Sequence, residues 1–383
     1  MSADGALFRK RLSMPLLCLE GPTGSGKSAV ADAVAARIGA ELVSVDSMQV
    51  YRGMDVGTAK TPPSARSVPY HCIDVLDPGE EYSAALFQRD ARRIVEELDA
   101  RGVPCVACGG TGFYMRALAD DLVFASDTPD KAAFRARYEQ LAQKEGREAV
   151  HALLAERDPE SARVIHPRNL TRVIRALEMC EEGESYAQRK EAFREVAPYY
   201  QALRLALRMN PETLAARIDA RVDEMMEAGL LAEVEGLLAK GYRGAATAGA
   251  AIGYKELVRH LDGELPLDEA VEMVKRDTRR YAKRQRTWLR GQRAVTWIDA
   301  EDGDVARMAG QVARLWEKAS RGNGEGEVAG AGESGGAAVF ARQEAPTAAA
   351  GAPARRGLRM GGEAPAPAVP AAGSGSAENA KGR

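Results

Sequence analysis

The sequence is poor in cysteine and has no long hydrophobic run, and both absences exclude classes of protein. Five cysteines among 383 residues are too few for a disulfide framework. Cys105 and Cys108 form a C-x-x-C motif without a second Cys/His pair at metal spacing, so we interpret them as structural. No apolar stretch approaches a membrane span, and residues 16–19 are too short for a signal-peptide core. We therefore expect a cytoplasmic protein with no membrane partner.

A large net charge is also missing, although positive charge is concentrated in one segment. The 53 Lys and Arg nearly balance the 55 Asp and Glu. Between Lys275 and Arg293, however, nine Lys/Arg accompany one acid, Asp277, within an expected helix from about residue 266 to 290. A charge run is usually a solvated helix face, but the interleaved Tyr281 and Trp288 favour contact with nucleic-acid phosphates.

What the sequence does contain is a complete phosphate-binding loop. Residues 21–28 fill the G-x-x-x-x-G-K-[ST] template without a gap. Its glycines let backbone N–H groups surround a phosphate, Lys27 neutralises the phosphate charge, and Ser28 is able to ligate Mg²⁺. The residues predicted to bind a di- or triphosphate are Gly21, Pro22, Thr23, Gly24, Ser25, Gly26, Lys27 and Ser28.

Strand and helix patterns alternate around this loop. Apolar stretches at 15–19, 42–45 and 103–107 read as buried strands, and helical patterns at 30–38 and 91–100 lie between them. This order predicts an α/β fold, in which a P-loop-type parallel sheet is flanked by helices.

Polar clusters follow three of the expected strands. They are the phosphate loop, Asp46-Ser47, and the run from Gly109 to Gly112. Ligands of parallel sheets bind at the carboxyl ends of the strands, so we expect the three clusters to converge. The Asp46 carboxylate then has three possible roles: a Mg²⁺ ligand, a general base or a helix N-cap.

Composition divides the rest of the chain. Residues 128–200 are polar and helical with no strand-like run, which indicates a helical lobe inserted into the core. Leu203–Met209 reads as a returning strand, and we expect Gly241 to end the helix that starts at Asn210-Pro211. From about Ser320 the chain is rich in Gly, Ala, Pro, Glu and Ser, which predicts a disordered tail. The expected boundaries are 14–127 and 201–319 for the two parts of the core, 128–200 for the lobe and 320–383 for the tail.

The phosphate loop alone leaves several functions open. A kinase for a nucleotide or small metabolite is the default interpretation, and it predicts an adenine site and ATP turnover. An RNA-binding NTPase switch is a second alternative, but the sequence has no clear second NTPase motif. Binding of ATP or of a prenyl diphosphate distinguishes these alternatives from the family considered next.

From about Leu16 to Trp297 the chain resembles the tRNA dimethylallyltransferases, also called tRNA isopentenyltransferases. Several motifs carry the resemblance in addition to the phosphate loop. In chain order they are Ser44-Val45-Asp46-Ser47 with Gln49 and Tyr51, Gly53 to Lys60, His71-Cys72-Ile73-Asp74, Tyr82-Ser83-Ala84, Gly109 to Gly112, Asp158-Pro159, His166-Pro167, Ile252-Gly253-Tyr254-Lys255 and Lys283-Arg284-Gln285 before Trp288.

The resemblance implies a reaction. The family transfers a dimethylallyl group from dimethylallyl diphosphate to N6 of the adenosine adjacent, on the 3′ side, to the anticodon of tRNA. It implies that the phosphate loop holds the diphosphate with Mg²⁺, that Asp46 is the base, and that Thr111 contacts the diphosphate at the breaking C–O bond. The target adenosine must be flipped out of its stack to react.

The resemblance also implies which residues contact the tRNA. We expect a monomer, and we expect its partners to be tRNA and dimethylallyl diphosphate. Lys283 and Arg284 match the family pattern, and the alternative that they face the diphosphate stays open. The predicted tRNA-binding residues are Asp46, Ser47, Met48, Gln49, Arg135, Thr171, Arg172, Arg175, Lys283 and Arg284.

Overall fold

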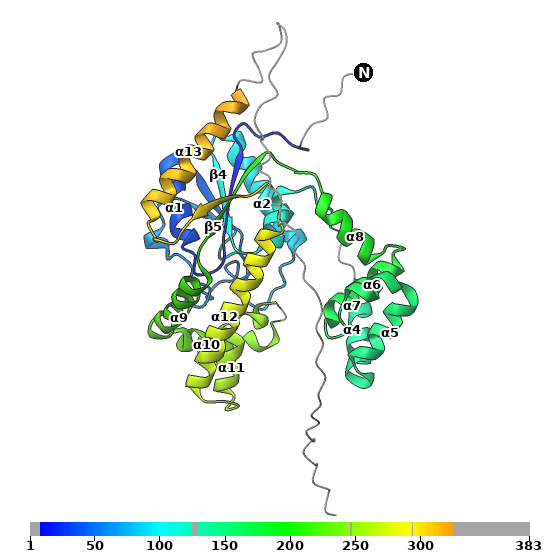
Figure 1. The fold of residues 1–383 in the computed structure, drawn as a ribbon. Helices are drawn as coiled ribbons and strands as arrows, with labels where there is room; N and C mark the ends of the chain where they lie inside the picture. Colours follow the sequence, from blue (N-terminus) through cyan, green and yellow to red (C-terminus); the bar gives the residue numbers. More distant parts are fainter. Residues whose placement is uncertain (1–7, 125–128, 246, 293, 325–383) are drawn as a thin grey trace, which may run out of the picture. The chain divides into compact units, whose positions relative to one another are not determined.

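The computed structural model describes residues 8–124, 129–245, 247–292 and 294–324 (Figure 1). Within these residues, six strands form one sheet in the order β3-β2-β4-β1-β5-β6, and all their pairings are parallel. The predicted α/β fold class is therefore confirmed. The strands are β1 (Leu16–Glu20), β2 (Glu41–Ser44), β3 (Tyr70–His71), β4 (Cys105–Gly109), β5 (Ala202–Arg208) and β6 (Thr296–Asp299).

Both faces of the sheet are buried because the side chains of each strand alternate. In β1, Leu16 and Cys18 belong to one hydrophobic cluster, and Leu17 and Leu19 belong to another. Figure 1 shows α1 and α13 next to each other on one side of the sheet and α2 on the other. The helices that contribute to the first cluster include α2 (Ala84–Ala100) and α3 (Gly112–Ala119), and α1 (Lys27–Ile38) and α13 (Val305–Gly324) contribute to the second.

The C-x-x-C cysteines lie on β4. Cys105 and Cys108 are buried and free, and burial raises the pKa of Cys108 to about 12. A thiol with a raised pKa is neutral at physiological pH, which supports the structural interpretation. Among the residues that the structure describes, no helix is long and apolar enough to cross a membrane.

The inserted segment is helical, as predicted, and has a hydrophobic core of its own. Buried residues of this core include Tyr138, Val150, Leu154 and Val173. Asp158 caps the helix α6 by accepting a hydrogen bond from the Ser161 backbone N–H at 3.0 Å. The helices of the segment are α4 (Pro129–Glu145), α5 (Arg147–Arg157), α6 (Pro159–Val164), α7 (Leu170–Glu181) and α8 (Tyr186–Ala192), followed by the short turn η2 (Phe193–Glu195).

The helix expected to run from Asn210 to Gly241 is instead two helices. Gly229 has a φ of 94°, a left-handed conformation that ends a right-handed helix, so the chain breaks there. The sequence prediction missed this break because Gly229 lies within a continuous apolar pattern. The remaining helices are α9 (Pro211–Glu227), α10 (Leu230–Ala239), α11 (Tyr254–Leu261) and α12 (Leu267–Arg290), and three further short turns are η1 (Pro63–Ala65), η3 (Tyr242–Gly244) and η4 (Ala248–Ala250).

The C-terminal helix also differs from the expectation. α13 continues through Ser320 to Gly324, past the position where the tail was expected to begin. Trp316 anchors this helix by donating from its indole Nε1 to the Pro15 carbonyl at 3.0 Å. The remainder of the expected tail lies outside the described residues.

Candidate active site

The phosphate loop joins the end of β1 to the start of α1. Gly24 and Gly26 have φ angles of 82° and 84°, which L side chains rarely adopt. The loop therefore turns sharply, and α1 begins at Lys27 with the positive end of its dipole at the loop. Gly21, Pro22 and Ser25 are buried beneath the turn, whereas Thr23, Lys27 and Ser28 line an adjacent pocket of about 460 Å³.

The expected convergence of the three clusters is present in this pocket. Asp46, Ser47, Met48 and Gln49 from the end of β2 line it, and so does Gly109 from the end of β4. Gly109, the last residue of β4, is required by close approach, because a Cβ there would lie 1.9 Å from the Val45 carbonyl oxygen. The sequence thus folds the phosphate loop and the two following strand ends around one cavity.

Asp46 uses one of its carboxylate oxygens to hold its own turn. Oδ1 accepts hydrogen bonds from the backbone N–H groups of Met48 at 2.9 Å and Gln49 at 3.4 Å. Within the described ranges, Oδ2 has no hydrogen-bond partner. Asp46 therefore caps a turn rather than a helix, and it keeps one oxygen for a ligand or a proton.

Thr111 is oriented by a contact with the same turn. Its Oγ1 accepts a hydrogen bond from the Ser47 backbone N–H at 3.2 Å. Because the hydroxyl oxygen is the acceptor, its proton remains available for donation to a ligand. Thr111 also stands at the N-terminus of α3, next to Gly112.

Gln49 is held by the protein itself. Its side-chain amide accepts from the Ser44 hydroxyl at 2.9 Å and donates to the Thr58 carbonyl at 3.1 Å. The pocket lining continues with Gly57, Thr58 and Ala59. The Gln49 amide therefore joins the strand end to this loop, with one amide proton left for a base edge.

Glu233, which no sequence pattern predicts, fixes the loop from the other side. Its carboxylate accepts from the backbone N–H groups of Asp55, Val56 and Gly57 at 2.8–3.1 Å and from the Tyr254 hydroxyl at 2.6 Å. The motif residues from Gly53 to Lys60 are therefore positioned by α10 and α11. No local pattern in the sequence indicates this contact, because the partners are separated by more than 170 positions.

The two arginines of α9 are likewise not apparent from the sequence. Arg221 lines the pocket, is partly buried and has no hydrogen-bond or ion-pair partner within the described part of the chain. Burial lowers the pKa of Arg221, although Glu224 opposes the shift. One turn earlier, Arg217 places its Nη2 atom 3.6 Å from the position of a Cβ on Gly26. The spacing of four residues indicates one shared helix face, but the sequence does not show that this face meets the phosphate loop.

Lys27 is the third cation at this end of the pocket. Burial lowers the pKa of Lys27, and nearby Cys108 and Asp46 oppose the shift. A desolvated ammonium next to the Arg221 guanidinium is a local excess of positive charge. Such an excess is compensated when a polyanion binds.

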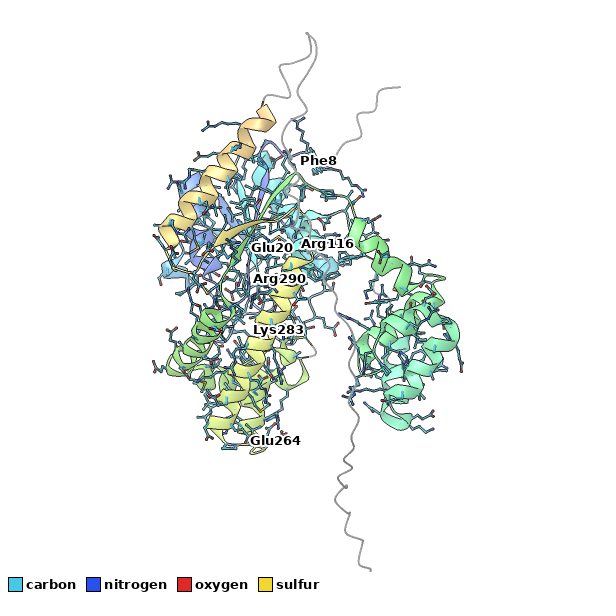
Figure 2. All side chains as sticks on the ribbon, in the orientation of Figure 1. Phe8, Glu20, Arg116, Glu264, Lys283 and Arg290 are labelled. Carbon is cyan, nitrogen blue, oxygen red and sulfur yellow. The ribbon has the colours of Figure 1, made fainter. Side chains whose placement is uncertain are left out.

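Lys283 and Arg284 take different positions on α12. Arg284 lines the pocket, and its guanidinium carbon lies 5.5 Å from the centre of the Tyr281 ring. Lys283 is exposed on the helix and is absent from the pocket lining (Figure 2). Burial raises the pKa of Tyr281 to about 12, so its phenol is neutral in the pocket.

The predicted residues of the lobe do not line this pocket. Arg135 and Arg175 both pair with the buried carboxylate of Glu178, at 2.6 Å and 2.8 Å. Thr171 and Arg172 are exposed on the first turn of α7. The lobe therefore presents cations from a separate surface.

The fold and pocket together define a class of protein: a P-loop α/β protein whose pocket carries several cations and a free carboxylate oxygen. Residues 49–292 match the model of the IPP transferase family. The chain is 44% identical over 303 residues to a tRNA dimethylallyltransferase of Carboxydothermus hydrogenoformans, covering 79% of this chain and 97% of the relative. It is 46% identical over 301 residues to one of Symbiobacterium thermophilum, covering 78% and 93%.

Solved structures agree with these relatives. A tRNA isopentenylpyrophosphate transferase of Bacillus halodurans superposes with a TM-score of 0.59 at 37% identity, covering 81% of this chain and 99% of that chain. A eukaryotic dimethylallyltransferase, described as acting on tRNA, gives a TM-score of 0.67 at 26% identity, covering 81% and 80%. The chain therefore belongs to the IPP transferase family, and the protein is an enzyme of the prenyltransferase class. Membership of this family gives no support to the kinase alternative or to the NTPase switch alternative.

Proposed function

We propose that this protein transfers a dimethylallyl group from dimethylallyl diphosphate to N6 of the adenosine on the 3′ side of the anticodon in tRNA, releasing diphosphate. The observation that carries the proposal is the free Oδ2 of Asp46 beside a phosphate loop, in a chain of this family. A kinase is also able to use a carboxylate as its base, so the family membership is what favours prenyl transfer over phosphoryl transfer. We propose the cytoplasm as its compartment, because its tRNA substrate is found there, and a monomer as its active form.

The diphosphate of the donor fits the cationic end of the pocket. Backbone N–H groups from Gly21 to Ser28 and the side chains of Lys27 and Arg221 would hold its oxygens. The described residues contain no group of three or more His, Cys, Asp or Glu able to hold a metal. Mg²⁺ does not need such a group, because it is commonly bound by a few protein oxygens together with substrate phosphates. The Ser28 hydroxyl would be the protein ligand. The chemistry that Mg²⁺ supplies when bound is neutralisation of charge on the diphosphate.

The transfer joins N6 to the dimethylallyl carbon and breaks the bond from that carbon to the diphosphate oxygen. The exocyclic amine is a poor nucleophile because its lone pair is shared with the ring, so Asp46 Oδ2 would accept the proton that N6 loses. The electron pair of the broken bond leaves with the diphosphate. The Thr111 hydroxyl would donate a hydrogen bond to the departing oxygen and keep its proton, which stabilises the negative charge that develops there.

The tRNA would be held by two separate cationic surfaces. Lys283 and Arg284 on α12 would follow backbone phosphates next to the pocket, and Arg135, Thr171, Arg172 and Arg175 would do so on the inserted lobe (residues 128–200). Ser47, Met48 and Gln49 line the pocket where the flipped adenosine must enter, and the remaining amide proton of Gln49 would bind its edge.

Ligand choice tests this proposal against the kinase alternative. We expect dimethylallyl diphosphate with Mg²⁺ to raise the melting temperature, since a ligand that binds only the folded state stabilises it by about 2.7 kcal/mol at 100 times its Kd. Inorganic diphosphate should have a smaller effect of the same sign. Stabilisation by ATP alone, with ATP turnover in the absence of tRNA, would contradict the proposal.

A further inference from the structure

Gln285 is a buried amide on the inner face of α12 that connects two loops of the pocket. The residue is 7% exposed. The amide oxygen Oε1 accepts a hydrogen bond from the Thr23 backbone N–H at 2.9 Å. The amide nitrogen Nε2 donates to the Gly110 carbonyl at 2.9 Å. One side chain thus contacts the phosphate loop after β1 and the Thr111 loop after β4.

The fit around Gln285 is close. A Cβ on Gly110 would lie 2.3 Å from Nε2, so only glycine leaves room for the amide there. Tyr281, one turn earlier on α12, lies near Thr111 and Gln285, whose side chains oppose the rise that burial causes in its pKa. The inner face of α12 is therefore built against the two loops.

The contacts continue from Gln285 to the proposed base. The Gly110 carbonyl is followed directly by Thr111, whose Oγ1 accepts from the Ser47 N–H, and Ser47 follows Asp46. One glutamine and one threonine thereby join three groups. They are the group proposed to bind the diphosphate, the group proposed to stabilise its departure, and the group proposed to take the proton. Only a side chain with both an acceptor and a donor at its tip makes the first link.

We propose that Gln285 is a positioning residue, which fixes the Thr111 loop relative to the phosphate loop and so aligns Thr111 and Asp46 with the leaving diphosphate. This inference rests on the proposed function. Gln285 acts through the two loops and does not itself touch the reacting atoms. Its loss should lower the rate of transfer more than the affinity for the donor, because a misalignment of about 1 Å costs about 10²-fold in rate.

Three variants test the inference, each compared with wild type in single-turnover transfer. Gln285→Met keeps the size of the side chain and removes both hydrogen bonds. Gln285→Glu keeps the acceptor for Thr23, but its carboxylate has no proton for the Gly110 carbonyl. Gln292→Met is the control, since Gln292 lies just beyond the same helix and, among the described residues, its side-chain amide bonds the Trp288 carbonyl alone, at 3.3 Å.

We expect Gln285→Met and Gln285→Glu to lower the single-turnover rate about 10- to 100-fold at pH 8, with the Kd of the donor and of tRNA changed less than threefold. As the pH falls from 8 to 5, the introduced carboxyl group gains a proton and regains the donor. The rate of Gln285→Glu relative to wild type should then rise, while the relative rate of Gln285→Met stays constant. A merely structural role would give no such recovery.

The outcomes separate this inference from the proposed function. If wild type transfers no prenyl group to tRNA, the proposed function fails. If wild type transfers the group and both Gln285 variants keep rates within threefold, the positioning role is wrong. The inference also fails if the rate loss matches a loss of correctly folded enzyme, measured by the stoichiometry of donor binding, or if Gln292→Met loses as much.

Discussion

The variant Asp46→Asn tests the chemical role of this side chain separately from its structural role. The asparagine oxygen is still able to accept from the N–H groups of Met48 and Gln49, so the turn keeps its cap. We expect the free energy of unfolding to change by less than about 0.5 kcal/mol. The other carboxylate oxygen becomes an NH₂ group, which cannot accept the N6 proton. A general base contributes about 10²–10⁴-fold, or about 2.7–5.4 kcal/mol of barrier, so the rate should fall by that factor.

The assay is single-turnover transfer with saturating tRNA and dimethylallyl diphosphate, and donor affinity is titrated separately. Donor affinity should stay within threefold of wild type. Asp77→Asn is the matched control, because the Asp77 side chain is 71% exposed and pairs with Arg52 at the surface. If the rate of Asp46→Asn stays within tenfold of wild type, Asp46 is not the base. Asp46→Ala should differ from Asp46→Asn in its free energy of unfolding, because it also loses two hydrogen bonds worth about 0.5–1.5 kcal/mol each.

Three further predictions concern the other ends of the pocket. Thr111→Val should lower the single-turnover rate about 10²–10³-fold while Thr111→Ser stays within tenfold, and equal rates for both variants would remove the hydroxyl from the mechanism. Lys27→Met should weaken donor binding yet raise the melting temperature of the free enzyme, because burial lowers the Lys27 pKa and so makes its charged form costly in the folded state. The unfolded chain then binds the Lys27 proton more tightly than the folded chain does. The free energy of unfolding of wild type should therefore rise relative to that of Lys27→Met as the pH rises toward the unfolded pKa. A difference between the two free energies that is the same at every pH would contradict this. Lys283→Ala should flatten the log–log salt dependence of tRNA binding by about one unit without changing donor affinity, whereas Arg284→Ala should weaken donor binding as well; identical effects of the two variants would refute their different placement.

The sequence predicts the parts of the site that local patterns encode. The phosphate loop is recognisable because its eight residues are contiguous and glycine is needed at defined positions. The meeting of that loop with Asp46 and Gly109 follows from topology, since parallel strands bring their carboxyl ends to one edge. The strand bounds differ by a few residues, as with β4, which starts at Cys105 rather than at 103.

Such patterns do not reveal groups on distant helices that line the pocket, as Arg221 does, or that hold one of its loops, as Glu233 does. Arg221 and Glu233 lie on helices whose packing is decided by tertiary contacts with segments more than 150 positions away. The break at Gly229, which separates these two helices, also depends on a left-handed backbone that an apolar pattern does not reveal. Lys283 and Arg284 are adjacent in sequence, and only the orientation of α12 shows that one of them lines the pocket.

Mass spectrometry of tRNA nucleosides tests the central claim most directly. Unmodified tRNA is incubated with the protein, Mg²⁺ and dimethylallyl diphosphate, then digested and analysed, with Asp46→Asn treated in parallel. We predict an adenosine heavier by one dimethylallyl group in place of hydrogen, mapped to the position on the 3′ side of the anticodon, with little product from the variant. Absence of this nucleoside with active, folded wild-type protein, or its formation at another position, would contradict the account.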